Sequence, residues 1–156
     1  FLIIENPVLD EALYALNASL ARWMASNFQE KKLVPELQHA KSYGYRLYDY
    51  QGKNQLAWVI HRLQSNPTTK SATITTFLPL EDRSYIPCVS LLDFKIREEW
   101  LLLTVTCRSL DFGKKALFNL LELLRIGKKV QEECNIPNIQ LNVHVISAHI
   151  YEQDLE

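Results

Sequence analysis

Several features that mark particular classes of protein are absent from this sequence. Its 156 residues include only three cysteines, Cys88, Cys107 and Cys134, and no CxxC pair. The four histidines are not grouped at metal-ligand spacing, so we expect no structural metal. An odd number of widely spaced cysteines favours a reducing compartment.

Neither sign of charge is in excess, and no apolar run approaches membrane-spanning length. Seventeen Lys and Arg residues against 18 Asp and Glu give a net charge of -1, which provides no electrostatic basis for binding nucleic acid or an acidic membrane surface. The opening "FLIIENP" lacks the basic region of a secretory signal. We therefore expect a cytoplasmic protein that binds neither nucleic acid nor membrane. The sequence begins with Phe1 and not Met, which leaves open that it is part of a longer chain.

Hydrophobic residues make up 47% of the chain, enough for residues 1–156 to form a single domain with a substantial core. Their spacing predicts helices from Asn6-Pro7 to about Ala25, from Leu56 to Asn66, and over 117–134. It predicts strands over 1–4 (buried), 72–78, 88–96, 100–107 and 139–151. Helix, strands, helix and strand in this order indicate an α+β fold with a mixed sheet.

Polar or reactive residues occur near the ends of two predicted strands. Cys88 follows Pro87 at the start of the apolar run "CVSLLDF" and is either a nucleophile or, as is usual for a cysteine met alone, a small buried hydrophobe. The segment "CRSLD" ends another strand with Arg108 and Ser109, which are natural ligands of a phosphate. The alternative for Arg108 is a surface ion pair with Asp111.

Two further places carry polar residues whose role has two interpretations. Asn119 lies among apolar residues in the first turn of a helix, where its amide either caps the helix or reads the edge of a ligand. His149 and Tyr151 are two residues apart and therefore share one side of a strand. They form part of a binding site or a half-exposed polar face.

Together these positions resemble the thymidylate synthases and their nucleotide hydroxymethylase relatives. The resemblance is carried by Pro87-Cys88, Arg108-Ser109-Leu110-Asp111, Phe118-Asn119 and His149-Ile150-Tyr151, in this order and at matching intervals. It extends upstream, where "DEALYALN" places Glu11 at the family's catalytic glutamate and "YGYRL" places Tyr43 at a tyrosine near the substrate. The resemblance therefore covers nearly the whole chain.

This resemblance implies a transferase that adds a methyl or hydroxymethyl carbon to C5 of a pyrimidine nucleoside monophosphate. Cys88 would attack C6 of the ring as a thiolate, while Glu11 and Tyr43 would manage proton transfer. The remaining family positions would bind the nucleotide: Arg108 and Ser109 its phosphate, Asp111 and Asn119 its base, His149 and Tyr151 its sugar hydroxyl. Asparagine at position 119 indicates uracil, because the cytosine-specific hydroxymethylases of the family carry aspartate there.

The resemblance also implies a fold, a cofactor and an assembly. The fold would be α+β, a mixed twisted sheet with helices on one face and its other face at a homodimer interface. Methylenetetrahydrofolate would be the one-carbon donor. Arginines lent by the second subunit complete the phosphate site in the family, and Lys70 is the candidate here for a residue lent in this way.

The sequence departs from the family mainly where folate would bind. Lys114-Lys115 replace a Leu-Gly dipeptide that shapes the folate pocket, and the tryptophans that line that pocket have no obvious counterpart. Lys70 and Ser71 stand where the family has its arginine pair. We therefore expect the nucleotide half of the site to be kept and the folate half to be eroded. This leaves open a nucleotide-binding module without turnover, or a subunit that keeps the fold only for its dimer surface.

Overall fold

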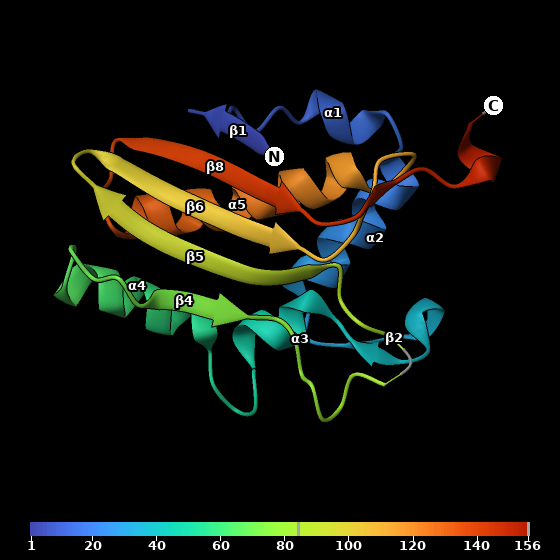
Figure 1. Ribbon diagram of the computed structural model, residues 1–156, viewed down its shortest axis with the longest axis horizontal. Coiled ribbons are helices and arrows are strands. Elements are labelled where there is room, and N and C mark those ends of the chain that lie inside the picture. Colours follow the sequence, from blue (N-terminus) through green and yellow to red (C-terminus); the bar gives the residue numbers. More distant parts are fainter. Residues whose placement is uncertain (84, 156) are drawn as a thin grey trace.

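A five-stranded mixed sheet forms the centre of the computed structural model, which describes residues 1–83 and 85–155 (Figure 1). In spatial order its strands are β1 (Leu2–Glu5), β8 (Asn138–Val145), β6 (Trp100–Cys107), β5 (Val89–Arg97) and β4 (Ala72–Thr75). Strands β6 and β8 run parallel, and the other neighbours are antiparallel. The predicted α+β fold with a mixed, twisted sheet is confirmed.

Helices cover one face of this sheet. The main ones are α2 (Ala18–Gln29), α4 (Gln55–Ser65) and α5 (Ala116–Glu133), and Figure 1 shows α2 and α5 behind the strands. α5 packs on β6 and β8, α4 packs on β4 and β5, and α2 lies against α5. Because side chains alternate along a strand, Leu101, Leu103 and Val105 of β6 all turn toward the helices and are fully buried.

The predicted N-terminal helix has different bounds in the structure. Asn6 does not cap it, because the Asn6 Oδ1 instead accepts a hydrogen bond from the Ile139 N–H at 3.0 Å and ties the end of β1 to β8. The chain is helical in α1 (Ala12–Ala15) and then in α2. Asn17 separates the two and caps α2 by accepting from the Leu20 N–H at 3.0 Å.

Three predicted strands also differ. The strand predicted over 72–78 ends three residues earlier, at Thr75. Strand β1 lies at the sheet edge, so Ile3 is exposed rather than buried. The strand expected over 139–151 ends at Val145, after which β9 (Ala148–His149) pairs in parallel with β7 (Leu110–Asp111). This small, separate sheet places Asp111 directly beside His149.

The segment between α2 and α4 contains short elements that pack closely on α2. They are β2 (Leu33–Val34), the 3-10 turn η1 (Pro35–Leu37), β3 (Ala40–Lys41) and α3 (Tyr43–Tyr48). A side chain at Gly44 would place its Cβ only 2.4 Å from the Glu30 carbonyl oxygen, so only glycine allows α3 this approach. In the part of the chain that is described, no helix is long and apolar enough to span a membrane.

Candidate active site

A pocket of about 440 Å³ lies at the end of the sheet where β5 begins and β6 and β8 finish. Val89, Cys107 and Val145 are partners across these three strands, so the segments just beyond them meet in space. The pocket is lined by Trp23, Met24, Asn27, Leu37, Tyr43, Tyr85, Cys88, Arg108, Ser109, Asp111, Lys115, Asn119, Ser147, His149 and Tyr151. Eight of the ten candidate residues from the sequence are among them.

Cys88 is half-buried at the floor of the pocket, one residue before β5. Its Sγ lies 3.5 Å from the Ser109 hydroxyl, which can donate a weak hydrogen bond to the sulfur. Backbone contacts fix its position, since its carbonyl accepts from the Arg108 N–H at 2.9 Å. The neighbouring Val89 N–H donates to the Tyr43 hydroxyl at 3.0 Å.

The Arg108 guanidinium holds the residues that lead into the cysteine. Its Nη2 donates to the Ile86 carbonyl at 2.7 Å and its Nε donates to the Pro87 carbonyl at 3.2 Å. Among residues 1–83 and 85–155, its Nη1 has no hydrogen-bond partner. Arg108 therefore keeps donors available for an anion in the pocket.

Asn119 lies in the first turn of α5, and Asp111 lies in the segment that leads into this helix. Asp111 does not form the ion pair that was the alternative for Arg108; its Oδ1 accepts from the backbone N–H groups of Gly113 and Lys114, at 3.0 and 3.2 Å. The Asn119 Nδ2 donates to the Lys115 carbonyl at 2.9 Å. Both side chains are buried at the pocket wall.

His149 and Tyr151 come to the pocket from the C-terminal segment. Their rings meet edge to face, with centroids 5.0 Å apart. His149 lies in β9 and is held beside Asp111 by the β7–β9 pairing. Both residues line the pocket, but Tyr151 lies beyond the end of β9, so they do not share the face of one strand as their spacing predicts.

Two tyrosines adjoin the thiol, and the second was not singled out from the sequence. Tyr43 is buried, and burial raises its pKa well above the ordinary value. Burial also raises the pKa of Tyr85 to about 12, with a smaller contribution from Cys88. Both phenols are therefore protonated at neutral pH and can serve as hydrogen-bond donors.

Trp23 and Lys115 also line the pocket, although neither was a candidate. Trp23 reads in the sequence as one more apolar residue of a helix stripe, and Lys115 enters the family resemblance only as half of the pair that replaces the Leu-Gly dipeptide of the folate pocket. In the structure the Lys115 Nζ lies 5.7 Å from the centre of the Trp23 ring. They come together because α2 packs against the start of α5, and no local sequence pattern predicts that packing.

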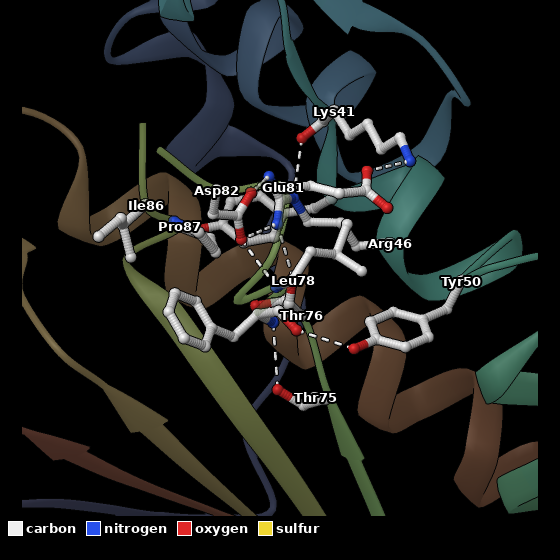
Figure 2. Close-up of polar contacts among 12 residues, drawn as sticks. Lys41, Arg46, Tyr50, Thr75, Thr76, Leu78, Glu81, Asp82, Ile86 and Pro87 are labelled. Carbon is white, nitrogen blue, oxygen red and sulfur yellow. Dashed lines mark hydrogen bonds and ion pairs between the residues drawn. The ribbon is translucent and has the colours of Figure 1, made fainter. Parts of the chain in front are cut away.

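A buried ion pair anchors the segment between β4 and the pocket, as Figure 2 shows. Arg46 of α3 makes two hydrogen bonds to Asp82, both of 2.7 Å, and donates to the Thr76 carbonyl at 2.8 Å. Asp82 also accepts from the Leu78 N–H at 2.7 Å. The Arg46 and Asp82 side chains are 1% and 5% exposed, so the pair is shielded from water.

The structure does not bring Glu11 and Lys70 to this pocket. Glu11 is exposed at the start of α1 and lines a separate cavity of about 500 Å³ with Tyr14, Arg22 and Arg125. Lys70 is exposed just before β4, whose first residue pairs with the middle of β5, away from the thiol. No group of three or more metal-ligating side chains occurs in the described ranges.

Comparisons with known proteins show which family the chain resembles. The sequence profile of the family described as thymidylate synthase matches residues 16–156. A candidate thymidylate synthase of Methanosarcina mazei is 33% identical over 157 residues, covering 97% of this chain and 71% of its own length. Another, from Methanothermobacter thermautotrophicus, is 36% identical over 113 residues, covering 71% of this chain and 51% of its own length.

The same fold occurs in the crystal structure of thymidylate synthase from T4 phage. That structure matches with a TM-score of 0.70 at 19% identity, over 97% of this chain and 66% of the phage protein. Profile, relatives and fold agree over nearly all of the sequence. This chain belongs to the thymidylate synthase family.

Proposed function

We propose that this chain activates C5 of a uracil nucleoside monophosphate for one-carbon transfer, with Cys88 as the nucleophile. The observation that carries the proposal is the pocket itself, which gathers one thiol with the charged, hydroxyl and amide groups that a nucleotide requires. Membership of the thymidylate synthase family supports a transferase.

The phosphate would bind to Arg108 and Ser109. A guanidinium offers its planar donors to phosphate oxygens, and Nη1 is available here while the other donors hold the loop. The Ser109 hydroxyl, beside the thiol, adds a neutral donor. His149 and Tyr151, on the wall formed by the C-terminal segment, would bind the sugar hydroxyl.

Asn119 would read the base, and its contact with the Lys115 carbonyl supports uracil. Because its Nδ2 donates to the Lys115 carbonyl, turning the amide over would set two oxygens against each other. The orientation leaves the Oδ1 to accept from N3–H of uracil and the second N–H of Nδ2 to donate to O4. Cytosine presents the opposite pattern at both positions.

The thiolate of Cys88 would add to C6, making C5 nucleophilic. The Cys88 carbonyl accepts from the Arg108 N–H and the next residue's N–H, that of Val89, donates to the Tyr43 hydroxyl, so the backbone that carries the sulfur is positioned before substrate binds. The raised pKa of Tyr43 keeps its phenol protonated and able to donate a hydrogen bond to the substrate or to water.

Methylenetetrahydrofolate is the usual one-carbon donor of thymidylate synthases, but the residues in the described pocket do not fit it. Trp23 offers a flat ring of the kind that stacks on a pterin, yet the Lys115 ammonium lies over that ring. Lys114 is engaged by Asp154 of the C-terminal segment. A stacked folate ring would have to displace the ammonium, so the proposal is limited to activation of C5.

Exchange of the C5 hydrogen tests this proposal. In heavy water, the native protein should remove the H5 proton resonance of uridylate or deoxyuridylate, since addition and elimination of the thiolate exchange that hydrogen. The Cys88→Ala variant should leave the resonance intact, and Cys134→Ala should behave as the native protein. Comparing the two nucleotides also identifies the preferred sugar.

A nucleotide-binding module without turnover is the second candidate, and one observation favours it. Glu11, which the family resemblance assigns to proton transfer, lies on a different cavity. Nucleotide binding by calorimetry together with a persistent H5 resonance would establish this candidate instead. Methylenetetrahydrofolate would then have no effect on binding.

A further inference from the structure

One cation in the pocket has no part in the steps above. Lys115 directly precedes α5, is half-buried, and places its Nζ near the Trp23 ring face. No carboxylate forms an ion pair with it among residues 1–83 and 85–155. A partly desolvated ammonium without a counter-ion favours negative charge brought by a ligand.

The position of Lys115 relates it to the base rather than to the phosphate. Its carbonyl accepts both the backbone N–H of Asn119, at 3.0 Å, and the Asn119 side-chain amide, at 2.9 Å. Lys115 therefore stands one helical turn before the residue that would bind N3 and O4. Arg108 and Ser109 lie on the strand-end side of the pocket, next to the thiol.

Negative charge develops at the base during the proposed reaction. When the thiolate adds to C6, the C5=C6 electron pair moves toward C4 and places charge on O4. Asp111 carries charge of the same sign and would oppose this, while Arg108 is committed to the phosphate and the loop carbonyls. Lys115 is the remaining cation among the described lining residues.

We propose that Lys115 is a further catalytic residue, whose ammonium stabilises the O4 enolate formed when Cys88 adds to the base. The inference rests on the proposed function. A cation on the α5 side of the pocket would stabilise the charge at O4. Glu11 is not placed to do so. Preorganised charge of this kind is effective because it is aimed at the place where charge develops.

The step balances without any additional reagent. A sulfur–C6 bond forms with the thiolate pair, and the π electrons shift to O4. A solvent proton then adds to C5 as the O4 electrons return. Loss of the original hydrogen from C5 and expulsion of the thiolate restore the uracil ring with one hydrogen exchanged.

The test compares nucleotide binding with release of tritium from C5-labelled deoxyuridylate. Lys115→Met should slow release by about 100-fold, as expected for loss of one oxyanion-stabilising group. Its dissociation constant for deoxyuridylate should change by less than about 3-fold, because the interaction exists mainly in the transition state. Lys115→Gln should behave alike, and Lys115→Arg should retain most of the release rate.

Lys128→Met is the matched control, because it removes the same charge from α5 away from the lining of the pocket. If Lys115→Met releases tritium at the same rate as Lys128→Met, this inference is overturned and the proposed function is not. Equal losses of binding and release would also overturn it, since Lys115 would then bind the ground-state nucleotide. No release by the native protein would overturn the proposed function and this inference with it.

Discussion

Cys88 differs from the other two cysteines in its surroundings. Cys107 is fully buried, and burial together with the nearby Cys88 raises its pKa to about 12. Burial likewise raises the pKa of Cys134, at the end of α5. Since the thiolate is the reactive form, a raised pKa keeps both thiols protonated and slow to react at neutral pH.

We expect iodoacetamide at pH 7 to alkylate Cys88 first. Cys107 should remain unlabelled in the folded protein at any pH well below 12, and deoxyuridylate should protect Cys88. Peptide masses after brief labelling measure all three sites. First labelling of Cys134, with no protection of Cys88 by the nucleotide, would show that the nucleophile is wrongly assigned.

We also predict that a single residue, Asn119, sets the choice of base. Asn119→Asp should narrow or reverse the preference for uracil nucleotides, because an aspartate accepts from the C4 amino group of cytosine. One buried polar group left unpaired costs about 1–3 kcal/mol, roughly tenfold to a hundredfold in affinity. Calorimetry with uridylate and cytidylate gives the ratio. Equal affinities in the native protein, unaltered in the variant, would mean that Asn119 does not read the base.

For single residues, the sequence predicted which of them line the pocket better than it predicted which other residues they contact. Candidates in ordered motifs converge on the pocket because β5, β6 and β8 end together. The contact between Trp23 and Lys115 was not predicted, since it depends on how α2 packs against α5. The placement of Glu11 likewise depends on the break between α1 and α2, which apolar periodicity conceals.

At the scale of elements, long periodic segments were predictable and short ones were not. The bounds of α4, α5, β5 and β6 nearly match the prediction, because each has a sustained apolar pattern. The β7–β9 pair is only two residues long in each strand and is fixed by long-range hydrogen bonds. No local pattern specifies such a pair.

The Arg46–Asp82 pair joins α3 to the segment before the pocket, and its loss should be costly. Asp82→Asn leaves a buried guanidinium without its counter-charge, which should lower the free energy of unfolding by about 3–5 kcal/mol. Glu81→Gln is the matched control: its partner Lys41 and Glu81 itself are 28% and 45% exposed, so the change should cost less than about 1 kcal/mol. Urea denaturation measures both. Similar, small losses would show that the buried pair does not anchor the segment.

For the whole molecule, the sheet face opposite the helices remains to be covered. It carries Thr73, Thr75, Leu91, Asp93, Lys95, Leu102, Thr104, Thr106, Gln140 and His144. Leu91, near the start of β5, is 37% exposed. A mixed face of this width is suited to packing against a second sheet, so a homodimer stays our prediction. A cytoplasmic location likewise stays a prediction.

Light scattering at micromolar concentration should give twice the mass of one chain. Leu91→Glu places a charge in the predicted interface and should yield monomers, whereas Leu80→Glu, at a residue 89% exposed in a loop, should not. If the partner lends Lys70, Lys70→Ala should weaken nucleotide binding although Lys70 does not line the pocket of its own chain. A monomeric native protein would contradict both predictions.

We propose that the pocket presents C6 of a uracil nucleotide to Cys88. A crystal structure with deoxyuridylate would show whether it does. We predict the phosphate on Arg108 and Ser109, the base against Asn119, and C6 within about 3.5 Å of the cysteine sulfur, the separation of reacting atoms in a near-attack geometry. A nucleotide bound in the cavity beside Glu11, or a base in this pocket with C6 turned away from Cys88, would contradict the claim.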